Sequence, residues 1–234
     1  QGSEDLIGPL FGILSAISFA LSNAATRRAV QTIPASFGIH ITIFIGIPLL
    51  VLAAAATGQL FDVSHLSNRA YFLLAAAGLN QFLLGRYTLY RSFAAIGANR
   101  STPITSLSVP LTLFLAMFVL GERISIINGV GIAIVVLAPV IMFEREPRPD
   151  EVETSRLWEG YFFALISALA SGITPVLIRE SIGGTGLGIV GGLVSYTAAA
   201  IPLLFWLAWP GNLTKVTQID KTALHWFVLT SFGL

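Results

Sequence analysis

The chain of 234 residues is too apolar for a soluble domain, because hydrophobic residues make up 55% of it and charged residues only 11%. Its mean hydropathy is +0.81, and a formal net charge of +1 offers no basic surface for nucleic acid. Cysteine is absent and the three histidines are scattered, so disulfides, thiolate metal sites and redox chemistry are excluded and we expect no cofactor.

Long apolar segments predict a polytopic membrane protein. A membrane helix needs about 20 mostly apolar residues. In chain order, such segments occur at Gly8–Thr26, Phe37–Ala56, Tyr71–Tyr90, Pro103–Leu120, Asn128–Phe143, Trp158–Ile178 and Leu187–Trp209, with an eighth beginning near Ala223. Between the fifth and sixth lies Glu144–Arg156, whose eight charges and two prolines are too polar for the bilayer.

The chain also contains an internal repeat. Gly8 opens GPLFGILSAISFALSNAATRRAV, and Gly160 opens the related stretch GYFFALISALASGITPVLIRESI. Five spans precede the charged linker, so the second copy enters the membrane from the opposite side and the repeat is inverted. We therefore predict an all-α membrane helical bundle built from five-helix units, with about eight helices present of roughly ten. Its parts are a first repeat at 1–143, a linker at 144–157 and an incomplete second repeat at 158–234.

Prolines interrupt several of these spans. Pro48, Pro110 and Pro175 lie inside predicted helices, where each removes a backbone hydrogen bond and favours a bend. Pro103 fits the first turn of the fourth span, where the missing N–H costs nothing.

The third to fifth spans carry a recognisable pattern. It consists of a small-residue corner at Ala94–Ala98, Pro110 within the fourth span, the ending Leu120-Gly121-Glu122, and Gly129 with Gly131 in the fifth. This segment resembles the EamA-type domain of the drug/metabolite transporter superfamily. The resemblance implies a ten-helix carrier of small organic solutes with a central cavity between its halves.

Polar residues recur at helical spacing within the apolar spans, where they are costly unless they face a cavity or a partner. The candidate substrate-binding residues are Ser15, Ser18 and Ser22 in the first span, Asn80, Arg86, Tyr87 and Arg91 in the third, Thr105, Ser108 and Thr112 in the fourth, and Ser167 and Thr174 in the sixth. Two alternatives stay open. Serine and threonine also hydrogen-bond across tight helix contacts, and an arginine near a helix end can extend to the lipid headgroups.

The leading functional hypothesis is a carrier of small neutral or anionic metabolites that works by alternating access. Apart from Glu159 at the start of the sixth, the predicted spans contain no Asp or Glu, which disfavours proton-coupled export of cations. One alternative is a non-transporting scaffold or receptor of the same fold. A less favoured one is a membrane enzyme acting on a lipid-linked substrate, because the sequence offers no cluster of acids, bases or metal ligands to support catalysis. We expect a multi-pass protein of the inner or plasma membrane, with a bias of Lys and Arg that favours an outside N-terminus. Its expected partners are a small-molecule solute and the lipid bilayer, with a second copy of the chain as a further candidate and no nucleic acid.

Overall fold

The computed structural model describes residues 4–30, 35–121, 129–134, 137, 154–209 and 212. Within these ranges the chain is helical and has no strand, which confirms the predicted all-α bundle. The elements are α1 (Glu4–Ala29), α2 (Ala35–Ala56), η1 (Gln59–His65), α3 (Asn68–Leu79), η2 (Asn80–Arg86), α4 (Tyr87–Ile96), α5 (Ala98–Thr105), α6 (Ser108–Val119), α8 (Thr154–Ile182) and α9 (Gly188–Ala208). Most of the predicted fifth span, most of the charged linker and the eighth span lie outside the described residues.

Several helices have the length and composition of membrane spans. By these criteria four segments qualify among the described residues: Phe37–Ala56, Ala98–Val119, Ser155–Ile182 and Gly188–Ala208. Large apolar side chains also point outward on several helices, including Leu52, Phe72 and Phe205, which are 66%, 73% and 74% exposed. An exterior of this kind suits a bundle that is surrounded by lipid rather than water.

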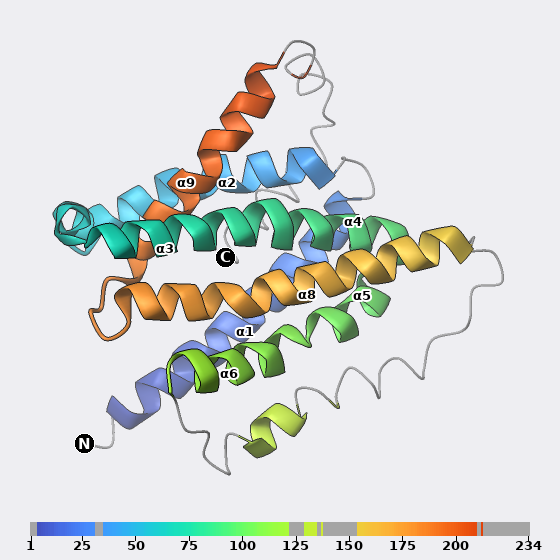
Figure 1. Ribbon diagram of the computed structural model, residues 1–234, viewed down its shortest axis with the longest axis horizontal. Coiled ribbons are helices and arrows are strands. Elements are labelled where there is room, and N and C mark those ends of the chain that lie inside the picture. Colours follow the sequence, from blue (N-terminus) through green and yellow to red (C-terminus); the bar gives the residue numbers. More distant parts are fainter. Residues whose placement is uncertain are drawn as a thin grey trace.

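The central contact of the bundle joins α8 to a long helix made of three consecutive elements. Elements α3, η2 and α4 follow one another without a break, and α8 runs antiparallel beside them (Figure 1). On its other side α8 packs against α5 and α6, while α9 crosses α2 and α3. Helix α1 packs against α4 and α5. A helix from the predicted second repeat therefore lies between the third and fourth spans of the predicted first repeat.

The fourth predicted span is two helices rather than one. Gly97 adopts a left-handed φ of 78°, which separates α4 from α5 at the small-residue corner. Helix α5 then ends at Thr105, and α6 begins at Ser108.

The two prolines of this span have the reverse of their predicted roles. Pro103 lies inside α5 rather than in its first turn, and Pro110 lies in the first turn of α6, where no intrahelical donor is lost. Pro110 has no N–H to donate to the Ser106 carbonyl. That carbonyl accepts instead from the Val109 N–H at 3.1 Å. The break between α5 and α6 thus follows from chain chemistry that the hydropathy pattern does not contain.

Close packing of α3 against α9 depends on a glycine. A Cβ added at Gly78 would lie 2.0 Å from the carbonyl oxygen of Ser195, a backbone atom that has no rotamer with which to move away. The Ser195 hydroxyl in turn donates to the Leu74 carbonyl at 2.9 Å. Small residues of this kind let membrane helices approach each other closely enough for such bonds.

Substitution of Gly78 by alanine should therefore force α3 and α9 apart. We expect Gly78→Ala to destabilise the folded protein by about 1–3 kcal/mol, the usual cost of overpacking, and thermal unfolding in detergent measures this. Gly12→Ala is the matched control, because Gly12 lies in α1 with no atom within 4 Å of the added methyl. Equal melting temperatures for the two variants would contradict the proposed contact.

Candidate functional site

A cavity of about 470 Å³ lies where α3, η2, α6, α8 and α9 meet. This volume is within the usual range for small-molecule sites, about 300–1,000 Å³. Helices from both sides of the charged linker form its wall. The lining residues are Ala77, Gly78, Gln81, Phe82, Arg86, Ser108, Val109, Ser171, Thr174, Pro175, Ile178, Gly192, Ser195 and Tyr196.

A π-helical segment forms one side of the cavity. Residues Asn80–Arg86 form η2, a π-helix within the long helix α3–η2–α4. The wider π turn loosens the regular hydrogen-bond ladder, and such segments occur often at functional sites. Here side chains bond the carbonyls at its end. Thr88 donates to the Leu84 carbonyl at 2.6 Å, and Ser167 of α8 donates to the Gly85 carbonyl at 2.9 Å.

Opposite the π-helix, α8 contributes a proline. Pro175 has no N–H, so the Ser171 carbonyl lacks its usual helical donor. Ser171, Thr174 and Pro175 all line the cavity. The cavity thus lies beside two departures from regular α-helical hydrogen bonding, one in η2 and one at Pro175 of α8.

Among the described residues, Arg86 is the one charged side chain that lines this cavity. The residue is only 8% exposed. Its Nη1 donates to the Tyr90 hydroxyl at 3.3 Å, and its guanidinium carbon lies 6.0 Å from the centre of the Phe82 ring. Its buried Nε makes no hydrogen bond among the described residues.

No carboxylate described by the structure forms an ion pair with Arg86. Asp62 pairs with His65 at 3.7 Å, Glu159 with Arg91, and Glu180 with Arg69. Burial of a charge without a counter-ion is expensive in a low-dielectric interior. Arg86 therefore places at the cavity wall a positive charge that no described carboxylate compensates.

Three of the predicted site residues line the cavity, namely Arg86, Ser108 and Thr174. Several others bond across helix contacts beside it. Asn80 Nδ2 donates to the Ala170 carbonyl at 2.7 Å and to Thr174 Oγ1 at 3.0 Å, and Thr112 donates to the Gly172 carbonyl at 2.9 Å. Asn80, Thr112 and Ser167 thus make interhelical contacts, the alternative left open for such residues.

The remaining candidates lie away from this cavity. In α1, Ser15 is exposed, Ser18 is half-buried and Ser22 is buried. Thr105 donates to the Thr102 carbonyl of its own helix at 3.1 Å. Arg91 donates to the Tyr87 hydroxyl at 3.3 Å and forms its ion pair with Glu159. The cavity thus gathers one predicted residue from each of the third, fourth and sixth spans and none from the first.

Other lining residues were not predicted from sequence. Ser171 follows Ser167 by one helical turn, and Tyr196 is a polar-tipped aromatic in an apolar span, so both carried a usable signal. Gln81 is the neighbour of Asn80. Phe82 carried none, because one more phenylalanine in an apolar helix does not stand out.

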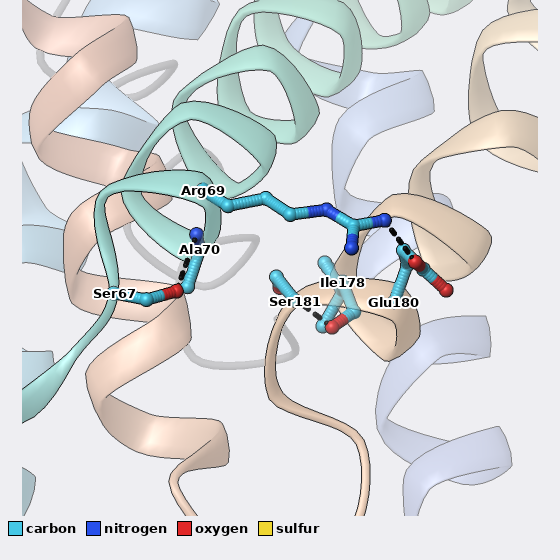
Figure 2. Close-up of polar contacts among 6 residues, drawn as sticks. All are labelled: Ser67, Arg69, Ala70, Ile178, Glu180 and Ser181. Carbon is cyan, nitrogen blue, oxygen red and sulfur yellow. Dashed lines mark hydrogen bonds and ion pairs between the residues drawn. The ribbon is translucent and has the colours of Figure 1, made fainter.

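Two ion pairs connect α8 with the long helix at opposite ends of their contact. Arg69 at the start of α3 pairs with Glu180 near the end of α8 (Figure 2). Arg91 in α4 pairs with Glu159 near the start of α8. Ser67 caps α3 beside the first pair by accepting from the Ala70 N–H at 3.2 Å (Figure 2). The cavity lies between these two ends.

A cavity lined by apolar helices, several of them of membrane-spanning length, is consistent with a membrane transporter. The chain belongs to the EamA-like transporter family, whose model matches residues 6–143. This matches the family that the corner, the proline and the Leu-Gly-Glu ending indicated.

Two curated relatives carry transporter names. A Sinorhizobium sp. protein named as an uncharacterized transporter in the cobO 3' region is 25% identical over 134 residues, which cover 56% of this chain and 93% of that protein. An uncharacterized transporter of Clostridium kluyveri is 21% identical over 153 residues, 65% of this chain and 49% of that protein. The chain therefore aligns with about half of the Clostridium protein.

The bond between Asn80 and Thr174 should couple η2 to α8. In a double-mutant cycle of Asn80→Ala and Thr174→Ala, we expect a coupling energy of about 0.6 kcal/mol and at most about 1.7 kcal/mol, the range found for polar pairs between membrane helices. Unfolding in mixed detergent measures it. Thr197→Ala, an exposed residue that bonds only within α9, should show no coupling to Asn80→Ala. A cycle that closes to zero would show that the pair does not join the two helices.

Proposed function

We propose that the protein is a secondary carrier of small organic metabolites, neutral or anionic, in the inner or plasma membrane. The main support for this proposal is the cavity between helices of the two predicted repeats, because a carrier that works by alternating access binds its solute at the interface of its repeats. The lining offers hydroxyls, one amide and one guanidinium, which suits reversible binding of a small polar solute.

The paired ends of the α8 contact support alternating access. Opening the cavity toward one side of the membrane would separate α8 from the long helix at that end, and opening toward the other side would separate the opposite end. Each opening would break one ion pair and leave the other closed. Since exposed ion pairs are worth only about 0–1 kcal/mol, neither would lock the protein shut.

Exchange of solute tests the proposal directly. The protein is reconstituted into liposomes, and counterflow is measured for labelled amino acids, nucleosides and organic acids. Ser108→Leu places a larger apolar side chain on the cavity wall and should lower the exchange rate to about a tenth or less of the parental rate, a change of about 1.4 kcal/mol. Thr102→Leu is the control, because Thr102 is exposed in α5 and does not line the cavity. Absence of flux for every solute with folded protein would contradict the carrier proposal.

Cysteine accessibility tests alternating access and separates a carrier from a scaffold. The chain has no natural cysteine, so Ser108→Cys supplies a single thiol at the cavity. We expect a membrane-impermeant thiol reagent to label it from one side with Glu159→Gln and from the other side with Glu180→Gln, because each substitution weakens one end of the α8 contact. Phe205→Cys on the outer face of α9 should stay unlabelled in both backgrounds. A scaffold without a working cavity would label identically in both.

A further inference from the structure

We propose that the carried solute is an organic anion with a single negative charge and an apolar body, and that Arg86 binds its charge. This inference rests on the proposed carrier function and names the substrate class of the same cavity. It starts from Arg86, a charge that the described part of the fold buries and leaves without a counter-ion.

The state of its nitrogen atoms shows that Arg86 is not fully used by the fold. Nη1 is held by the Tyr90 hydroxyl at 3.3 Å, and Nε is buried with no partner among the described residues. A buried donor without an acceptor costs about 1–3 kcal/mol, and more when it is charged. A fold that retains this cost gains nothing from it unless a ligand supplies the acceptor.

The bond to Tyr90 also orients the guanidinium. With Nη1 held by Tyr90, Nε remains a buried donor that has no acceptor among the described residues. Adjacent N–H groups of a guanidinium match the two oxygens of a carboxylate, and charge-assisted bonds of this kind are roughly twice as strong as neutral ones. The predicted partner of the Arg86 guanidinium is therefore a carboxylate, or an anion of similar shape.

The rest of the lining determines what the charge is attached to. Phe82 and Tyr196 stand edge to face with ring centres 4.4 Å apart, and Val109, Pro175 and Ile178 complete an apolar surface. Among the described lining residues there is no second cation, so a dianion would leave one charge unpaired there. The same residues include no carboxylate, so a cation would meet Arg86 uncompensated by them. A monoanion with an apolar body satisfies both conditions.

Matched acids and amides test the inference. Benzoate and phenylacetate are compared with benzamide and phenylacetamide by calorimetric titration of the purified full chain. We expect each acid to bind at least about tenfold tighter than its amide, as a charged hydrogen-bonded pair implies. Arg86→Gln should remove this preference, and Arg86→Lys should keep part of it. Arg156→Gln removes a charge from the exposed start of α8 and should change nothing.

Stability without ligand provides an independent readout. If Arg86 serves a ligand rather than the fold, Arg86→Gln should melt at a higher temperature than the parent when no solute is present, because an unpaired buried charge is gone. The proposal would be overturned if Arg86→Gln melted at a lower temperature than the parent and both Arg86→Gln and Arg86→Lys kept the full preference for acids over amides. So would equal affinity of acid and amide for the parental protein.

The same experiments separate this inference from the carrier proposal. Exchange of neutral solutes in liposomes that is independent of Arg86 would support the carrier proposal and contradict the anion site. Acid-selective binding that requires Arg86, without exchange of any probe, would support the anion site and contradict the carrier proposal.

Discussion

Close packing of α8 against the long helix α3–η2–α4 is the contact on which the rest of the bundle depends. Its inward positions carry small residues, and Gly160, Ala164 and Ala168 are buried. Its outward positions carry large ones, such as Phe162 and Leu165, which are 60% and 47% exposed. This reverses the pattern of a soluble helix, because lipid removes the advantage of burying large apolar groups and leaves close approach and hydrogen bonding as the main attractions.

Close approach brings backbone carbonyls within reach of side chains on the neighbouring helix. Ser92 donates to the Gly160 carbonyl at 2.8 Å, and Ser167 and Thr112 make equivalent bonds to Gly85 and Gly172. These hydroxyls are used by the packing itself. The cavity opens at the π turn and Pro175, where the ladder of small residues and hydroxyls gives way to irregular backbone. The irregular backbone and the binding surface are therefore two aspects of one local structure.

The sequence predicted the helices well and the site less completely, for physical reasons. Helix positions follow from the length of the apolar segments, which hydropathy measures directly. The break at Ser106–Leu107 depends on which carbonyl each proline leaves without a donor. At the π turn, Ser167 of α8 donates to the Gly85 carbonyl, so neither feature is encoded by the local sequence alone. The serines Ser15, Ser18 and Ser22 are regular in spacing yet lie at the periphery of the described bundle, because spacing identifies a face of a helix and does not say what that face meets. Arg86 does not share the helix face of Asn80, Tyr87 and Arg91, and only its position farther from the end of the third span distinguishes it from Arg91 in the sequence.

Three arginines on the long helix differ in position, and this difference separates two structural charges from the one that we propose binds the solute. Arg69 and Arg91 lie near its ends, where each meets a glutamate of α8 and water remains close enough to limit the cost of the charge. Arg86 lies between them, buried, with Tyr90 as its one hydrogen-bond partner among the described residues. Two of the hydroxyls that line the same cavity, those of Thr174 and Ser195, already donate to helix carbonyls. Within the proposed mechanism, an arriving anion would supply the missing compensation. Binding would then be strongest in the closed arrangement, where water is excluded and the attraction between opposite charges is least screened.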